Sequence, residues 1–224
     1  MTRYFQPLLW ASFFVGTTLV CADEAAAPPV APAAPVAPAP SVTPNFSLFK
    51  APTLHLRIVA DETINENSVL IEYDIRKKGE LARAEMTVAG VHQTFIDRDK
   101  ACYSYIDGSA TGLILNPGVA GSQIAVAALM DMVVKGGKQI GTEKVEGEDC
   151  AIYEQEIGTT LKQTVWVSLA KGWPVKSVST SITPDTKVVS VKLYKDIEVN
   201  PELADDLFKL PEDLTFAEPP AAAN

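Results

Sequence analysis

The stretch 122-SQIAVAALMDMVVKGG-137 decides the fold. Ser122 is a good N-cap residue, because its hydroxyl can accept a hydrogen bond from an otherwise unpaired backbone N–H of the first turn. Gly136 and Gly137 can adopt the left-handed conformation that ends a helix, and Lys135 faces the negative end of the helix dipole. The stretch therefore predicts a helix with two defined ends.

Apolar side chains cover nearly every face of this helix, and only Gln123 and Asp131 interrupt them. The apolar set is Ile124, Val126, Leu129, Met130, Met132, Val133 and Val134. Such a helix is expected to be buried on more than one side, and it is shorter than the roughly 20 apolar residues that span a bilayer. Two interpretations stay open, a simple core helix or a helix that also bounds an apolar cavity. We expect Leu129→Asp to be far worse for folding than Asp131→Leu.

Almost everything around this helix has the alternation of a half-buried β-strand. The expected strands are 54–58, 69–75, 81–88, 91–97, 102–106, 112–115, 139–145, 151–157, 164–169, 175–182 and 187–197. Short strands separated by Gly and Asp turns are typical of an antiparallel meander. The sequence therefore predicts a mainly β (α+β) fold, an antiparallel open half-barrel wrapped around one central apolar helix.

The N-terminal region predicts export. Residues 1–22 resemble a secretory signal, with Arg3, an apolar run and a small-residue cleavage site at Val20-Cys21-Ala22. Cys21 leaves lipidation or a retained anchor open as the minority alternative. An Ala/Pro-rich linker (23–45) should follow, a semi-rigid spacer reaching about 60 Å at about 3.1 Å per residue. We expect the folded domain at 46–216, a disordered tail at 217–224, and a periplasmic location.

Composition and motif content exclude several functions. The formal net charge of −9 argues against binding to nucleic acid and against electrostatic docking on anionic lipid. The two histidines, His55 and His92, lack a nucleophile elbow and any metal-ligand spacing. The carboxylates of residues 143–149 surround a turn, where solvated charges are the expected state. We therefore expect no catalytic residue, no metal and no cofactor.

Three further residues carry open alternatives. Cys102 and Cys150 lie on opposite sequence sides of the central helix, and export permits a disulfide between them, against two buried thiols. Asp131 is the charge within the apolar helix, and it must be paired, neutralised or hydrated. It is expected either at the helix edge near the mouth of the half-barrel, or at the rim as a contact for a ligand head group.

A resemblance appears in the last hundred residues. The segment 141-GTEKVEGEDC-150 resembles the "GTE-x-V-x-G-x-x-C" strand turn of secreted bacterial proteins with a LolA/LolB-like fold. The segments 165-VWVS-168 and 172-GWPVK-176 are similar to that group's "VW(I/V)S…G-x-P-(V/L)-K" hairpin. The segments 194-YKDI-197 and 207-LFKLP-211 are similar to its closing "Y-x-D-I…LF-x-LP" pattern.

The resemblance implies an open half-barrel with an apolar interior that holds acyl chains, in an uncharacterised branch of the lipoprotein-carrier superfamily. The expected function is a non-enzymatic periplasmic binder or carrier of a lipid or acylated lipoprotein, including lipoprotein sorting to the outer membrane. The alternative is an envelope protein-interaction module with a packed interior and a Pro-rich spacer. The candidates for lining a ligand cavity are Ile124, Leu129, Met130, Met132, Val133 and Trp166.

Overall fold

The computed structural model describes residues 43–218, so the expected leader, nearly all of the linker and the last six residues lie outside the described part. The helical elements are η1 (Phe46–Lys50), α1 (Ser122–Gly136) and η2 (Asp205–Phe208). The strands are β1 (Thr53–Ile64), β2 (Asn67–Lys78), β3 (Leu81–Val88), β4 (Val91–Arg98), β5 (Ala101–Ile106), β6 (Thr111–Leu115), β7 (Lys138–Val145), β8 (Glu148–Ile157), β9 (Leu161–Ser168), β10 (Pro174–Ile182), β11 (Lys187–Val199) and β12 (Thr215–Ala217).

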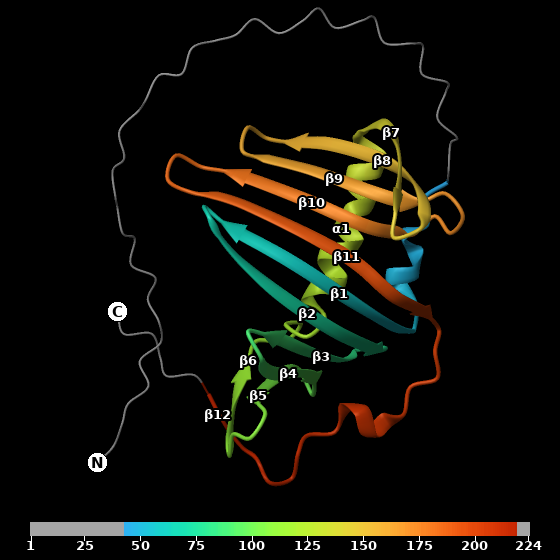
Figure 1. Cartoon of the computed structure of the whole chain (residues 1–224). Coiled ribbons are helices and arrows are strands. Elements are labelled where there is room, and N and C mark those ends of the chain that lie inside the picture. The colour runs from blue at the N-terminus through green and yellow to red at the C-terminus, as the bar shows by residue number, and fades with distance from the viewer. Residues whose placement is uncertain (1–42, 219–224) are drawn as a thin grey trace, which may run out of the picture. The chain divides into compact units, whose positions relative to one another are not determined.

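These strands form one 12-stranded sheet in the order β12-β6-β5-β4-β3-β2-β1-β11-β10-β9-β8-β7 (Figure 1). Successive neighbours pair antiparallel, except that β12 pairs parallel to β6. β12 and β7 stand at the two ends of this order and do not pair with each other, so the sheet is open. The predicted mainly β, open antiparallel half-barrel with one α-helix is confirmed.

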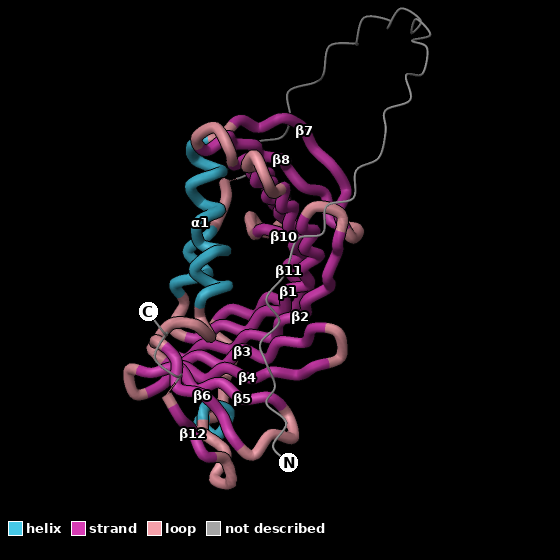
Figure 2. Tube along the Cα trace, turned by 90° about the vertical axis from the view of Figure 1, so that its left-hand side faces the viewer, coloured by secondary structure: helices cyan, strands magenta, loops and turns pink. Residues whose placement is uncertain are grey.

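Helix α1 stands along one face of the curved sheet, from the β7–β8 end to the end formed by β3 to β6 (Figure 2). We call the face that packs against α1 the helix-facing face and the opposite one the far face. No helix among the described residues is both long and apolar enough to cross a membrane.

The ends of α1 differ from the prediction. The N-cap is Gly121 rather than Ser122, and no side chain caps the first turn. Gly137 follows the last turn with extended backbone, φ −90° and ψ −176°, so the expected left-handed ending is wrong. A Cβ on Gly137 would lie 2.5 Å from the carbonyl oxygen of Glu154. The glycine is therefore required because β8 passes so close, and the chain enters β7 directly.

The core lies between α1 and the helix-facing side of the sheet. Its buried residues come from β1 (Leu54, Leu56, Ile58), from β9 (Val165, Val167) and from α1. The short helix η1 adds Phe46, Leu48 and Phe49, each at least nine-tenths buried. This element was not predicted from the sequence, although the closely spaced apolar residues of 45-NFSLFK-50 indicate it.

The segment after β11 covers part of the far face. Phe208 of η2 is almost fully buried, and two arginines hold the backbone around it. The Arg83 guanidinium donates to the carbonyl oxygen of Leu207 at 3.2 Å, and that of Arg98 donates to the carbonyl oxygen of Phe208 at 3.2 Å. The C-terminal segment is thereby tied to β3 and β4.

Candidate functional site

The side chains of α1 divide into a buried and an exposed stripe. Ile124, Ala127, Met130 and Val133 are buried against the sheet and η1, and we call them the core stripe. Val126, Leu129 and Met132 are 37%, 56% and 62% exposed, and we call them the exposed stripe. The expectation that the helix is buried on several sides is therefore wrong for this second stripe, because the open sheet meets only part of the helix surface.

An apolar groove of about 390 Å³ runs beside the N-terminal half of α1, and we call it the α1 groove. It is lined by Phe49, Lys77, Gly79, Glu80, Leu81, Ala82, Asp97, Gly118, Gly121, Ile124, Ala125 and Ala128. These residues come from η1, from β2, β3 and the turn between them, from β4, from the loop before α1 and from α1. A volume of this size lies within the range of small-molecule sites, about 300–1,000 Å³.

The groove keeps its shape because Asp97 holds the loop before α1. Its two carboxylate oxygens accept hydrogen bonds from the backbone N–H groups of Gly118 and Gly121, both at 3.0 Å. Asp97 is only 6% exposed, so its charge is stabilised by these two donors. Gly118 has φ +90°, a backbone conformation that glycine adopts without strain. The carboxylate thus fixes where the helix begins.

A single cation stands at the groove among its lining residues. Lys77 is half-buried, and its ammonium donates to the carbonyl oxygen of Ala51 at 3.3 Å. A lysine ammonium has three donors, so this contact leaves capacity for an anionic group. The same lining also includes the carboxylates of Glu80 and Asp97.

The opposite flank of α1 is tied to the sheet by a polar contact. The Lys192 ammonium on β11 donates to the side-chain oxygen of Gln123 at 2.9 Å. Burial lowers the pKa of Lys192, partly opposed by the carboxylate of Glu62. Removing the Lys192 ammonium from water costs free energy, and the neutral amide of Gln123 does not offset that cost as a carboxylate would. The contact therefore positions the helix without making a strong bond.

The predicted cavity residues do not come together. Ile124 lines the α1 groove, whereas Met130 and Val133 are fully buried in the core. Leu129 and Met132 face solvent, so the expected burial of Leu129 is wrong. Sequence periodicity could not separate these residues because apolar side chains lie all around the helix.

Trp166 lies on the far face of the sheet. Its neighbours Val165 and Val167 pack in the main core, and alternation turns Trp166 the other way. It packs with Val145 and Cys150 in a separate small cluster, and its indole N–H donates to Glu143 at 2.7 Å. Trp166 is therefore far-face packing and not part of the α1 groove.

Asp131 and the cysteines take the simpler of their alternatives. Asp131 pairs with Lys135 one turn later, 2.5 Å from Nζ to Oδ2, at the partly exposed helix edge.

Cys102 and Cys150 are free and buried. They lie on β5 and β8, with seven strands between them in the sheet, so a disulfide is excluded because its Cα atoms must lie within about 7 Å. Burial raises the pKa of the Cys102 thiol to about 12.

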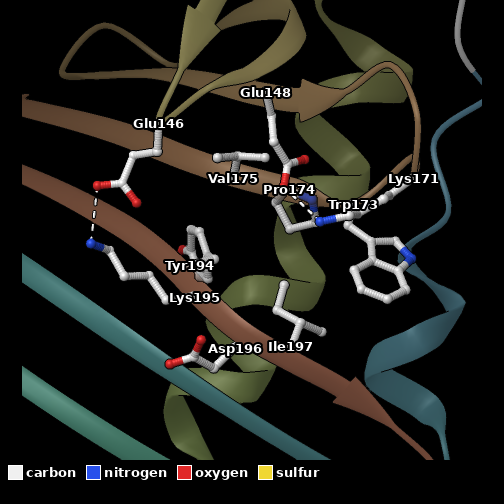
Figure 3. Close-up of a pocket in the computed structure, with 10 residues that line it drawn as sticks. All are labelled: Glu146, Glu148, Lys171, Trp173, Pro174, Val175, Tyr194, Lys195, Asp196 and Ile197. Atoms are coloured by element: carbon white, nitrogen blue, oxygen red, sulfur yellow. Dashed lines mark hydrogen bonds and ion pairs between the residues drawn. The ribbon is translucent and has the colours of Figure 1, made fainter.

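A second pocket of about 370 Å³ lies at the turns after β7 and β9 (Figure 3). Its charges are already paired: Glu146 with Lys195 at 3.0 Å and Glu148 with Lys171 at 2.6 Å (Figure 3). The hydrogen bond from Lys171 holds the pKa of Glu148 below its usual value. Each of these two carboxylates is thus held in an ion pair.

The histidines contact acidic or hydroxyl partners away from this pocket and from the groove lining. His55 lies 3.1 Å from Asp74 and 3.5 Å from Glu198. His92 contacts the Thr87 hydroxyl on the neighbouring strand. In the described part of the chain, no group of three or more His, Cys, Asp and Glu side chains could hold a metal ion.

Comparison with known proteins shows likeness of fold. No protein-family model matches the chain, and no curated protein matches its sequence. An uncharacterised conserved protein from Thermus thermophilus shares the fold with a TM-score of 0.51 at 9% identity, over 78% of this chain and 94% of that one.

Two further solved structures match at lower scores. One is a LolA superfamily protein from Nitrosomonas europaea, with a TM-score of 0.40 at 14% identity, over 74% of this chain and 94% of that one. The other is a chain of the Pseudomonas aeruginosa MucA/MucB complex, with a TM-score of 0.44 at 12% identity, over 76% of this chain and 59% of that one.

Proposed function

We propose that this protein is a non-enzymatic binder or carrier of a lipidic ligand in the periplasm, with the acyl chain lying in the α1 groove. The observation that carries the proposal is the groove itself, about 390 Å³ and lined mainly by apolar side chains and glycines. Burying an acyl chain there is favourable by about 0.8 kcal/mol per methylene group. The leader-like sequence of residues 1–22 supports export.

The ligand position differs from the cavity that the sequence suggested. The space between α1 and the sheet is filled by Met130, Val133 and the aromatic residues of η1. An acyl chain therefore has its place beside the helix, against Phe49, Ile124 and Ala128, rather than beneath it. Lys77 at the groove offers an ammonium to the polar end of the ligand, and the carboxylates of Glu80 and Asp97 line the same groove.

A matched pair of substitutions tests this position. Ala125 and Val126 are adjacent exposed residues of α1, but Ala125 lines the α1 groove and Val126 belongs to the exposed stripe. Ala125→Trp should fill the groove and weaken binding of fluorescent palmitate by about tenfold or more, since about 1.4 kcal/mol corresponds to tenfold in affinity. Val126→Trp should leave the affinity unchanged. Equal affinities for both variants and the unsubstituted chain would rule out the groove as the site.

The native ligand can be sought in the same preparations. Protein released from the periplasm and extracted under native conditions should carry acyl-containing material, and the Ala125→Trp variant should carry less. Repeated lipid analysis without such material would contradict the carrier function.

The second candidate function is an envelope protein-interaction module. The observation in its favour is the packed interior, where Met130 has 0% and Val133 has 1% exposure. In that case palmitate should not bind to any variant, and a protein partner should remain bound during purification.

A further inference from the structure

The free edge of the sheet beside β6 carries an aromatic slot that the chain fills with its own C-terminal strand. Phe216 of β12 pairs in register with Gly112 of β6. A Cβ on Gly112 would lie 2.5 Å from Cε1 of Phe216 and 2.7 Å from the carbonyl oxygen of Ser104. The phenyl ring therefore lies directly on bare backbone, a position that exists only because residue 112 is glycine.

Two tyrosines of the next strand complete this slot. The ring centroid of Phe216 lies 5.2 Å from that of Tyr103 and 6.4 Å from that of Tyr105, with interplanar angles of 81° and 72°. Edge-to-face pairs of this kind are favourable by about 0.5–1.5 kcal/mol each. The slot, defined by Gly112, Tyr103 and Tyr105, is therefore built for an aromatic side chain.

β12, the strand that occupies the slot, covers only part of the outer edge of β6. β12 has three residues, and they pair with Thr111 to Leu113, whereas β6 continues to Leu115. On the helix-facing side, Ala217 is the register partner of Leu113, and Leu113 stays 44% exposed. Ile106 on β5 is also exposed, at 47%. A small alanine thus stands where a large apolar side chain would cover more surface.

We propose that the outer edge of β6 is a docking site for an extended peptide segment of a partner protein, and that β12 occupies it in cis. The preferred segment carries an aromatic residue at the register of Gly112, directly followed by a large apolar residue beside Leu113. Consecutive residues of a strand point to opposite faces, so one enters the aromatic slot while the next covers Leu113. Backbone hydrogen bonds along β6 add affinity, as in other cases of strand addition. The site uses none of the residues that line the α1 groove, so it stands independently of lipid binding.

β12 and the preceding segment are held by separate contacts. The additional backbone contact at its start, from the Thr215 N–H to the carbonyl oxygen of Ala110, is 3.3 Å long. Upstream, η2 is anchored by buried Phe208 and by the two arginine contacts. The contacts that anchor η2 come before residues 209–214 in the chain, and β12 comes after them. β12 can therefore be displaced without disturbing η2.

The test uses the full chain and its Phe216→Ala variant with a labelled peptide, Asp-Leu-Thr-Phe-Leu-Glu. This peptide copies residues 213–218 with leucine in place of the alanine. We expect the variant to bind it about tenfold or more tightly than the unsubstituted chain, because the slot is no longer occupied and the competent fraction rises. Replacing the peptide's phenylalanine with alanine should abolish binding, and restoring its alanine should weaken binding severalfold.

Thermal unfolding followed by circular dichroism checks that the variant is folded. If Phe216→Ala fails to fold, Phe216→Leu keeps apolar contact without the aromatic edge and should still bind the peptide more tightly than the unsubstituted chain. Equal binding by the unsubstituted chain and the folded variant, or equal binding of the phenylalanine and alanine peptides, would overturn the proposal. A stable dimer that Phe216→Ala dissociates would also overturn it, by assigning the edge to a second copy of the chain.

Discussion

The core stripe and the exposed stripe of α1 are both apolar, but one is buried and the other faces solvent. Met130 is completely buried, whereas its neighbour Leu129 is 56% exposed. The difference arises because the sheet is open, so it covers one side of the helix and leaves the other free. The comparison teaches that an apolar helix surface need not be a core surface. The exposed stripe is apolar although it does not pack in the core.

The largest effect is expected from aspartate at adjacent positions of the two stripes. Met130→Asp buries an unpaired charge and removes core contacts, so it should lower the free energy of unfolding by at least about 4 kcal/mol. Leu129→Asp should cost about 1 kcal/mol or less, mostly through helix propensity. Urea denaturation of both variants measures the difference. Similar losses would mean that the division into two stripes is wrong.

The next effect concerns the loop that positions the core stripe. Asp97→Asn replaces one carboxylate oxygen with an amide nitrogen, so the N–H of Gly118 or Gly121 loses its acceptor. A buried unsatisfied donor costs about 1–3 kcal/mol, and we expect a loss in this range. Binding of fluorescent palmitate should also weaken, since the same loop lines the α1 groove. An unchanged melting curve would show that Asp97 does not hold the helix start.

A pH effect is expected on the flank of the exposed stripe, at Lys192. Burial puts its pKa in the folded chain below the ordinary value of 10.5. Between these two pKa values the unfolded chain binds more protons than the folded chain. The free energy of unfolding should therefore rise as the pH increases toward about 10.5. Lys192→Met should remove this part of the rise and be more stable than the unsubstituted chain at neutral pH. Urea denaturation at about pH 7 and about pH 10 gives the slopes, and identical slopes would contradict the role of Lys192.

The smallest effect is expected at Asp131, on the partly exposed edge of α1. Its pair with Lys135 is an i,i+4 contact, which stabilises a helix by about 0.2–0.5 kcal/mol. Asp131→Asn should therefore lower the free energy of unfolding by no more than this amount, and high salt should remove the difference. Palmitate affinity should stay unchanged because Asp131 does not line the α1 groove. Weaker palmitate binding would restore Asp131 as a head-group contact.

Helix α1 and most of the strands could be predicted from the sequence, whereas η1 and β12 could not. Helix α1 was predicted from its apolar run and spans Ser122–Gly136, and the period of two predicted the strands, because both patterns depend on local geometry. The open antiparallel sheet followed from short strands joined by short turns. These features need only neighbours along the chain.

The tertiary structure alone decided which apolar residues are buried and where grooves form. Leu129 and Met130 are equivalent in the sequence, and only the reach of the sheet and of η1 separates them. The α1 groove joins Phe49, Leu81 and Ala128 from three distant segments, and the separation of Cys102 from Cys150 depends on strand order. Each of these depends on contacts between residues far apart in the chain, which periodicity does not encode.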